Sequence, residues 1–373
     1  MKKILFLSPL PPPYYGSAIS SEMCLDILKN TKDIEVRNIK LNYSKEMSDV
    51  GKIDLGKIKG SFEVKKEIGK QIRKFNPEIV YFIPATSGFA LIRDFLFAEE
   101  IKKSYKKKIL FHIRSRTTRN SFNDILYKKM FLNQKAIVLG ESLVSDISPW
   151  IKKDDISILP NAVKNVISDY QLKSIISHRK KNEFLNILFL SNMDETKGWP
   201  KLLEACKILK RKGFSFRCDF VGAWQSKEDE KDFCDFVKKN DLEKIVFAHG
   251  RKTGKEKNTF LAKANVLVFP TEYKFETFGR VILEAYMFAV PVIANKIATI
   301  SDTIQDKKTG FILEKNDAEE IARYLKEIHN NKNLSEIMGK TGRQRFLSEY
   351  ELDKYRKKFR ELFYSQAPGV VAD

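Results

Sequence analysis

Two glutamates and a glycine in the segment 270–288 are of types that could together hold a phosphorylated ligand. Glu276 and Glu284 are eight residues apart, which on one continuous helix would leave their side chains about 80° apart. The composition of 280–288 instead predicts a helix that begins after Gly279, with Glu276 in the preceding loop and Glu284 inside the helix. The free N–H groups at such a helix start could receive a diphosphate, and a carboxylate on each side could accept hydrogen bonds from sugar hydroxyls. The alternative is an acidic residue in the first turn plus a solvated helical glutamate.

Two further loops in the second half of the chain carry residues suited to a nucleotide. Lys197 and Gly198 stand between an apolar run and a helical pattern, where a lysine can neutralise a phosphate. Gly222 directly follows another apolar run, at a strand end of the kind that lies against a nucleotide. A solvent-facing lysine and a simple tight turn are the alternatives.

In the first half of the chain, the corresponding candidates are His112 and Gly16. His112 lies in the apolar run 109–113, shortly before Arg114. Functional groups collect at the carboxyl ends of parallel strands, although a histidine there is more often structural. Gly16 follows a Pro-Pro-Pro-Tyr-Tyr run and either allows a ligand to approach the backbone closely or completes a turn.

A repeated pentapeptide indicates which elements position these residues. Ile-Leu-Phe-Leu-Ser occurs at 4–8 and again at 187–191, each time followed by a loop and an amphipathic helical pattern. Strand, loop and helix in this order open a doubly wound sheet, whose buried parallel strands are nearly continuous apolar runs. Other runs of this kind lie at 78–83, 108–113, 136–139 and 156–159 in the first half, and at 217–221, 245–248, 266–269 and 291–294 in the second.

These patterns predict an α/β fold of two Rossmann-like domains whose parallel sheets face each other across a cleft. A chain of 373 residues is long enough for two domains. The first is expected over 1–168 and the second over 183–350, with the polar segment 169–182 as the linker between them. A helix is expected in the last segment, 351–373.

The composition excludes several classes of protein. Hydrophobic residues make up 43% of the chain, which rules out disorder throughout. The four cysteines form no C-x-x-C pair and the four histidines are scattered, so we expect reduced thiols in a cytoplasmic protein and no metal site. No segment reaches the ~20 apolar residues of a membrane-spanning helix.

The chain has an excess of positive charge, with 68 basic against 48 acidic residues. Such an excess would suit nucleic acid, an anionic membrane or a phosphorylated ligand as a partner, but no nucleic-acid-binding motif accompanies it.

The segment with the two glutamates resembles a known family. Glu-Thr-Phe-Gly-Arg-Val-Ile-Leu-Glu-Ala at 276–285, Pro-Val-Ile-Ala at 291–294 and Thr-Gly-Phe-Ile-Leu at 309–313 strongly resemble glycosyltransferase family 4, the glycosyl transferases group 1, with its E-x7-E signature. The resemblance is tight over 187–313 and looser over 1–162. It implies the GT-B arrangement of two Rossmann-like domains, with a closing helix that crosses back to the first domain.

The resemblance also implies an activity and roles for residues. The activity is a retaining, metal-independent transfer of a sugar from a nucleotide diphosphate sugar to an acceptor hydroxyl, with the donor as substrate and no cofactor. Glu284 would bind the ribose of the nucleotide, and Glu276 hydroxyls of the donor sugar. Phe278 and Gly279 would present backbone amides to the diphosphate, which Lys197 would neutralise.

Four more positions belong to the implied site. His112 matches the family's active-site histidine, so that His112 and Glu276 are the expected catalytic residues, and Gly16 matches the glycine-rich loop. Asn192 stands where the family usually has an arginine, so the diphosphate would rely more on Lys197, or on Arg280 or Arg251.

Other departures concern glycines. Ala289 replaces a usual glycine, and Ala298 with Thr299 replaces a Gly-Gly pair near the donor loop. The expected acceptor is a lipid-linked or growing cell-surface glycan, as in polysaccharide, capsule or lipopolysaccharide biosynthesis. The alternative is a non-catalytic GT-B partner subunit of a sugar transferase complex.

The excess positive charge is concentrated in the first domain. Residues 1–180 hold 33 basic and 19 acidic residues, against 35 and 29 in the rest. From Lys102 to Arg119 there are eight basic residues and no acidic one, after an aromatic-rich stretch at 89–98. We hypothesise that this surface docks on anionic lipid at the inner face of the cell membrane. A solvated, lysine-rich face is the alternative.

Overall fold

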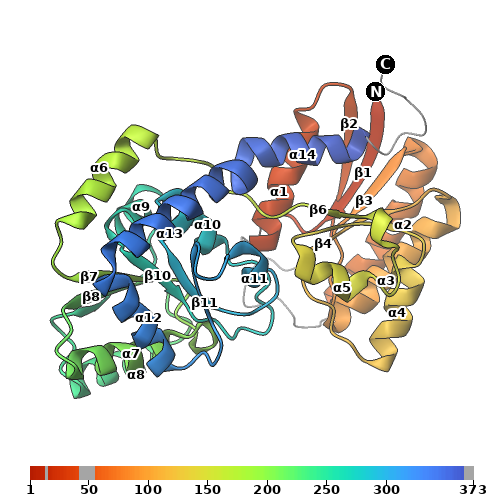
Figure 1. Cartoon of the computed structure of the whole chain (residues 1–373). Coiled ribbons are helices and arrows are strands. Elements are labelled where there is room, and N and C mark those ends of the chain that lie inside the picture. Colours follow the sequence, from red (N-terminus) through yellow and green to blue (C-terminus); the bar gives the residue numbers. More distant parts are fainter. Residues whose placement is uncertain (13–15, 42–54, 365–373) are drawn as a thin grey trace. The chain divides into compact units, whose positions relative to one another are not determined.

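The computed structural model describes residues 1–12, 16–41 and 55–364, and the chain divides into two compact units (Figure 1). Unit 1 comprises Met1–Asn161 and the chain from Tyr355 onward, and unit 2 comprises Ala162–Lys354. Each unit is built on a six-stranded, wholly parallel sheet with helices around it. The prediction of two α/β domains with parallel sheets is therefore confirmed.

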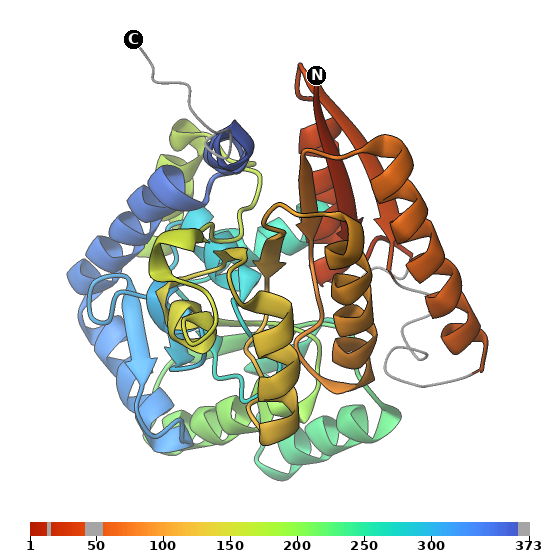
Figure 2. The same ribbon diagram turned by 90° about the vertical axis from the view of Figure 1, so that its right-hand side faces the viewer.

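Unit 1 has the strand order β2-β1-β3-β4-β5-β6. Its elements in chain order are β1 (Lys2–Ser8), α1 (Gly16–Lys29), β2 (Ile34–Lys40), α2 (Leu55–Phe75), β3 (Ile79–Phe82), α3 (Gly88–Ser104), β4 (Leu110–Ile113), α4 (Ser121–Phe131), β5 (Lys135–Val138), α5 (Val144–Ile147) and β6 (Ile156–Ile158). Residues 4–7 of β1 are fully buried, as expected for a parallel strand covered on both faces. Helix α2 packs beside β1 and β2 (Figure 2).

Unit 2 has the strand order β12-β11-β10-β7-β8-β9. Its elements are α6 (Asp169–Lys180), β7 (Leu185–Leu190), α7 (Trp199–Arg211), β8 (Phe216–Val221), α8 (Lys227–Lys239), β9 (Val246–Ala248), α9 (Gly254–Lys263), β10 (Val266–Phe269), α10 (Arg280–Met287), β11 (Val292–Asn295), α11 (Ile300–Thr303), β12 (Gly310–Leu313), α12 (Ala318–Asn330) and α13 (Lys332–Arg345). All six residues of β7 are buried. This is the strand that repeats the β1 sequence.

The last helix, α14 (Leu352–Tyr364), belongs to unit 1 from Tyr355 onward. Tyr355, Phe359 and Phe363 form its buried face, and the rings of Phe359 and Phe363 lie 5.8 and 5.6 Å from that of Tyr81 in β3. Aromatic contacts thus attach this helix to the unit-1 sheet. The part of the predicted segment 351–373 that follows residue 364 lies outside the described residues.

The prediction of a linker at 169–182 is wrong, because most of this segment forms α6. Ser168 caps the helix by accepting from the Gln171 N–H, while the Gln171 side chain accepts from the Ser168 N–H. Such a capping box stabilises a helix start, and Leu172 and Arg179 are buried.

The sequence patterns also did not predict strand β2. It is an edge strand whose central residues are exposed, so it lacks the continuous apolar run of a buried strand.

A helix end in unit 2 allows a test of backbone strain. Helix α10 ends in a Schellman motif, in which the Val290 N–H donates to the Ala285 carbonyl and the Ala289 N–H to that of Tyr286. The motif places Ala289 at φ +51°, where a Cβ costs about 1–2 kcal/mol. Glycine relieves this strain but also makes the unfolded chain more flexible, which offsets part of the gain. We therefore expect Ala289→Gly to raise the free energy of unfolding by about 0.5–1 kcal/mol. Denaturant unfolding checks this, with Ala285→Gly inside the helix expected to destabilise by about 1 kcal/mol. A destabilised Ala289→Gly variant would contradict it.

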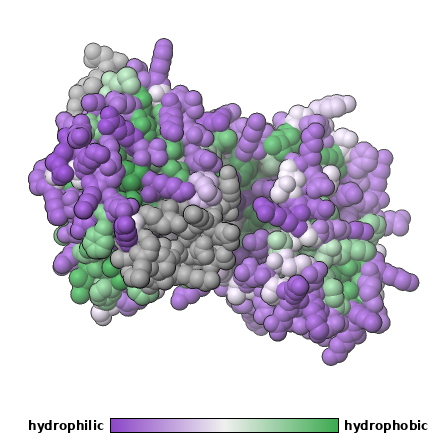
Figure 3. All heavy atoms as spheres, turned by 180° about the vertical axis from the view of Figure 1, so that it is seen from behind, coloured by the Kyte–Doolittle hydropathy of each residue, from purple (hydrophilic) through white to green (hydrophobic). Residues whose placement is uncertain are grey.

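Polar and charged residues dominate the face of the protein that Figure 3 shows. On the face drawn in Figure 3, hydrophobic residues form small separate patches between hydrophilic ones. In the described part of the chain, no helix combines the length and the hydropathy needed to cross a bilayer.

Candidate functional site

The residues predicted around the E-x7-E segment lie at the carboxyl end of the unit-2 sheet. After β10 the chain forms a loop that holds Glu276, and α10 begins behind Gly279, which adopts φ +66°. Glu284 lies in the second turn of α10 and is partly exposed. The predicted placement of the two glutamates, one in the loop and one in the helix, is what the structure shows.

The Lys197 loop packs directly against the Glu276 loop. Gly198 has φ +86°, and a Cβ there would lie 2.3 Å from the carbonyl oxygen of Pro270, so glycine is required. The Glu272 N–H also donates to the carbonyl of Thr196 at 2.6 Å. These backbone contacts bring Lys197 to the start of α10.

Lys197, Glu276 and Gly279 form one hydrogen-bonded group. The Lys197 ammonium donates to Glu276 Oε2 at 2.8 Å, and the Gly279 N–H donates to Glu276 Oε1 at 3.2 Å. The ammonium also lies 3.9 Å from the centre of the Tyr273 ring, a favourable cation–π distance. The lysine and glutamate side chains are only 15% and 16% exposed. The group combines a cation, a helix-start amide and a carboxylate, which can hold a phosphate and a hydroxyl side by side.

Glu284 has a partner that the sequence patterns did not reveal. Its Oε1 accepts from the Lys257 ammonium of α9 at 2.7 Å, and both side chains are mostly buried. An ionised, partly buried carboxylate of this kind is suited to accept hydrogen bonds from vicinal hydroxyls. The two residues are 27 positions apart, so only the packing of α9 beside α10 brings them together.

The remaining unit-2 candidates have mixed surroundings. Phe278 is buried, with its ring edge-on to Tyr350, so only its backbone is available to a ligand. Arg280 begins α10, and Asn192 is exposed in the loop after β7. At Gly222 a Cβ would lie 1.7 Å from the Ser191 carbonyl oxygen, which means that this glycine lets the ends of β7 and β8 meet.

In unit 1, His112 is buried in β4 among polar groups. Its Nδ1 lies 2.5 Å from the Tyr81 hydroxyl and 3.5 Å from an Arg114 nitrogen. The guanidinium can only donate, so Nδ1 is assigned as the acceptor and Nε2 as the protonated nitrogen. Among the described residues, Nε2 meets no hydrogen-bond partner. His112 therefore holds a buried N–H that can donate to a ligand oxygen.

The surroundings of His112 favour its neutral form. Burial, and then the Arg114 charge, hold the pKa of His112 well below its usual value. The unfolded chain takes up a proton at this histidine near pH 6.5, while the folded chain does not. The contribution of neutral His112 to the free energy of unfolding is therefore fully present above that pH and is lost as the pH falls below it. We expect wild type to lose about 1.4 kcal/mol more than a His112→Gln variant between pH 7.5 and 5.5. Urea unfolding at both pH values measures this, and equal losses would contradict a neutral His112.

Gly16, the other unit-1 candidate, is the first residue of α1 and is exposed. A Cβ at Gly16 would meet no atom of the described residues within 4 Å. No described residue therefore requires glycine here, and the two predicted reasons for it, a close approach by a ligand or a turn, both stay predictions.

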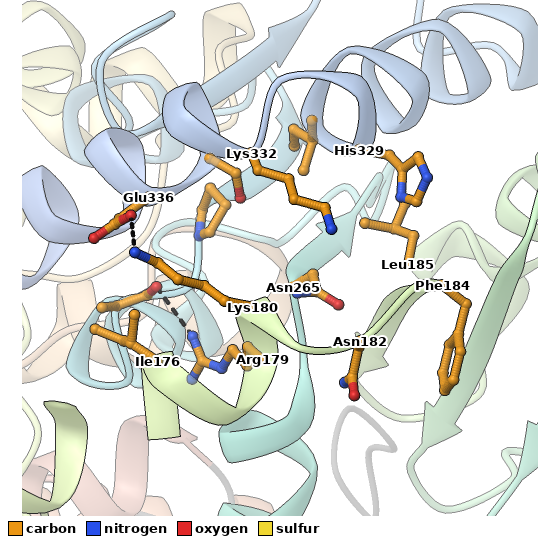
Figure 4. Close-up of a pocket in the computed structure, with 14 residues that line it drawn as sticks. Ile176, Arg179, Lys180, Asn182, Phe184, Leu185, Asn265, His329, Lys332 and Glu336 are labelled. Carbon is orange, nitrogen blue, oxygen red and sulfur yellow. Dashed lines mark hydrogen bonds and ion pairs between the residues drawn. The ribbon is translucent and has the colours of Figure 1, made fainter. Parts of the chain in front are cut away.

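Two further features of the described residues were compared with the candidate site: clusters of metal-binding side chains and a pocket in unit 2. No three His, Cys, Asp or Glu side chains of the described ranges converge in a way that could hold a metal ion. A pocket of about 70 Å³ in unit 2 (Figure 4) lies beside Leu185, Asn265 and Pro291, which precede or begin strands. It is therefore at the amino-terminal edge of the sheet, whereas ligands of such sheets bind beyond the carboxyl ends. None of the predicted site residues lines it.

Comparisons with known proteins identify related chains. Residues 171–345, which include Lys197, Glu276 and Glu284, match the family model of the glycosyl transferases group 1. The capsular polysaccharide biosynthesis glycosyltransferase CapM of Staphylococcus aureus is 26% identical over 332 residues, covering 76% of this chain and 84% of CapM.

Solved structures share the whole fold. A glycosyltransferase from Rickettsia africae ESF-5 has a TM-score of 0.72 at 17% identity and covers 98% of both chains. Anabaena HepE, solved in complex with UDP, has a TM-score of 0.72 at 15% identity, over 98% of this chain and all of that one. The two-domain fold expected from the sequence is thus the fold of these glycosyltransferase structures.

Proposed function

We propose that this chain transfers a sugar from a nucleotide diphosphate sugar and that the anomeric configuration is retained. Residues 171–345 match the family model of the glycosyl transferases group 1, and the glycosyltransferase CapM is similar over most of both chains, which supports the transfer of a sugar. The observation that carries this proposal is the group of Lys197, Glu276 and Gly279 at the start of α10. A lysine ammonium and a helix-start amide stabilise the charge that develops on a departing diphosphate. The reaction then needs no metal ion.

The roles of the other residues follow from their chemistry. Glu284, fixed by Lys257, accepts hydrogen bonds from the ribose, and Glu276 accepts them from the transferred sugar. The unpartnered Nε2–H of His112 donates to a substrate oxygen, and because Nε2 already carries a proton it is not the base that takes the acceptor proton. A phosphate oxygen of the leaving group takes the acceptor proton instead.

The acceptor we propose is a cell-surface glycan, free or lipid-linked. CapM acts in capsular polysaccharide biosynthesis by name, and the match spans most of both chains. The site does not distinguish between acceptors of this class, so the support for this part of the proposal is the relationship alone.

A ligand screen tests the donor. The protein is mixed with UDP-, GDP- and ADP-sugars, and the thermal transition is recorded for each. One nucleotide sugar at 100 times its dissociation constant should stabilise the protein by about 2.7 kcal/mol. The product formed with an acceptor should keep the donor's anomeric configuration by NMR. If no nucleotide sugar binds, or the configuration is inverted, the proposal is wrong.

The structure changes the hypothesis of a membrane surface. Five of the eight basic residues from Lys102 to Arg119 are paired with carboxylates, and Arg114 donates to Ser17, Ser21 and Cys24. The pairs are Lys102–Glu99, Lys103–Glu100, Lys108–Asp155, Arg116–Asp146 and Arg119–Asp124. Much of the charge in this segment is therefore paired within the chain, and further support for membrane binding comes from the neighbouring apolar surface.

We propose instead that the surface of α3 and α4 contacts an anionic membrane. Its apolar part comprises the exposed side chains of Phe89, Ile92, Leu96, Phe122, Ile125 and Leu132. Exposed Lys128 and Lys129 lie on the same helix as Phe122 and Ile125. Apolar side chains that insert at the interface, with each neighbouring lysine adding about 1 kcal/mol, are sufficient for peripheral binding.

Vesicle sedimentation tests this surface. Wild type should pellet with vesicles that contain anionic lipid and not with neutral ones, and a Phe122→Ser/Ile125→Ser variant should stay in solution. Ile337→Ser, which removes an exposed apolar side chain of α13, is the control and should pellet like wild type. Equal binding to both kinds of vesicle, or none to either, would contradict the proposal.

A further inference from the structure

The Glu276 carboxylate occupies two of the groups that a diphosphate would use in unit 2, the Lys197 ammonium and the Gly279 N–H. Oε2 accepts from the Lys197 ammonium at 2.8 Å, and Oε1 accepts from the Gly279 N–H at 3.2 Å. A carboxylate and a phosphate offer these two donors the same kind of anionic oxygen. The anion site at the start of α10 is thus already satisfied by an anion from the chain itself.

The backbone around Glu276 is held independently of this side chain. The Glu276 N–H donates to the Tyr273 carbonyl at 2.8 Å. The Thr277 carbonyl accepts from the backbone N–H and the hydroxyl of buried Thr299, at 2.9 and 2.6 Å. The loop can therefore stay in place while the Glu276 side chain, which has three rotatable bonds, changes partner.

We propose that Glu276 stands in for the donor's diphosphate when the site is empty and thereby makes the protein discriminate between a nucleotide sugar and the nucleoside diphosphate product. The inference rests on the proposed function. When the donor binds, its diphosphate takes over Lys197 and the Gly279 N–H, and Glu276 finds new donors in the sugar hydroxyls.

The product offers Glu276 no such replacement. A nucleoside diphosphate displaces the carboxylate from its two partners but brings no sugar hydroxyl, so the carboxylate is left beside a second anion. Loss of a charge-assisted partner is costly in a partly buried place. Glu276 therefore favours release of the nucleoside diphosphate after transfer.

Calorimetric titration of Glu276→Gln with UDP, GDP and ADP tests this inference. Glutamine keeps the shape and removes the charge that competes for Lys197, so the variant should bind the accepted nucleoside diphosphate about three- to tenfold more tightly than wild type. The affinity of the variant for the matching nucleotide sugar should rise by a smaller factor than its affinity for the nucleoside diphosphate, or should fall. The ratio of the two affinities, which favours the nucleotide sugar in wild type, should therefore decrease. In a Lys197→Met background, Glu276→Gln should change the affinity for the nucleoside diphosphate by less than about twofold.

Glu272→Gln is the matched control, because it removes one negative charge from the same loop. Its carboxylate pairs with Lys201 at 2.5 Å and not with Lys197, so its affinity for the nucleoside diphosphate should stay within about twofold of wild type. If Glu276→Gln binds the nucleoside diphosphate no more tightly than wild type, or if Glu272→Gln tightens it equally, the inference is wrong. If wild type binds no nucleoside diphosphate, the proposed function fails as well.

Discussion

A Lys197→Met variant will bind the nucleotide sugar about 30- to 150-fold more weakly than wild type, because it loses a charge-assisted hydrogen bond to the diphosphate worth about 2–3 kcal/mol. The Lys197 side chain is 15% exposed and its ammonium is already aligned on an anionic oxygen of Glu276, so the ammonium itself needs little reorganisation when the diphosphate replaces that oxygen. Turnover should fall as well, since the same charge stabilises the departing diphosphate.

Lys201→Met is the control for this prediction. Lys201 lies four residues after Lys197, in the first turn of α7, and pairs with Glu272, outside the hydrogen-bonded group at the start of α10. Calorimetric titration of both variants, together with initial rates of transfer, separates loss of the site cation from loss of charge in general. Donor affinity that is unchanged in Lys197→Met, or reduced equally in Lys201→Met, would contradict the role given to Lys197.

An Arg179→Met variant will lose about 3–5 kcal/mol of stability, the second large effect we expect. The guanidinium of Arg179 is buried and donates to four carbonyls at the ends of α9 and α10, those of Leu261, Ala262, Phe288 and Ala289. Its charge also faces the negative ends of both helix dipoles. Removing the side chain leaves four buried acceptors without these donors, which is the costly case for a hydrogen-bonded group.

The neighbouring Lys180 is the control for Arg179. Figure 4 shows the Lys180 side chain directed to Glu336, while Arg179 points to the helix ends. Because Lys180 is more than half exposed, Lys180→Met should cost less than about 1 kcal/mol. Calorimetry of the unit-2 transition measures both variants, and a small effect of Arg179→Met would show that the helix ends do not depend on this residue.

Arg179 also links stability to the site. Helix α9 carries Lys257 and α10 carries Glu284, and these two side chains form the ion pair proposed to receive the ribose. Because the hydrogen bonds of Arg179 join the ends of both helices, we expect them to help set the distance between the Lys257 and Glu284 side chains. We therefore expect Arg179, in a segment whose composition predicted a linker, to support the proposed donor site.

The local features of the site could be predicted from sequence. The apolar run at 266–269 predicts β10, and the change to a helical pattern after Gly279 places Glu276 in the loop and Glu284 in the helix. These inferences depend on residues close together in the chain. The alternation of buried parallel strands with helices was readable for the same reason, because each strand carries its own apolar run.

The partners of the site residues could not be predicted in this way. Lys197 meets Glu276 across 79 positions and Lys257 meets Glu284 across 27, and only the packing of separate loops and helices creates these pairs. The ion pairs of the basic stretch from Lys102 to Arg119 could not be predicted for the same reason. Its partners include Asp146 and Asp155, which a count of charges along the chain does not reveal.

The donor affinity and turnover of a Glu284→Ala variant test the central claim, a nucleotide sugar bound at the E-x7-E segment, most directly. Glu284 should give the ribose charge-assisted hydrogen bonds, so the variant should bind the donor about 10- to 100-fold more weakly. Glu319→Ala, at an exposed position of α12, should behave like wild type. A folded Glu284→Ala enzyme with unchanged donor affinity and unchanged turnover would contradict the assignment of the site.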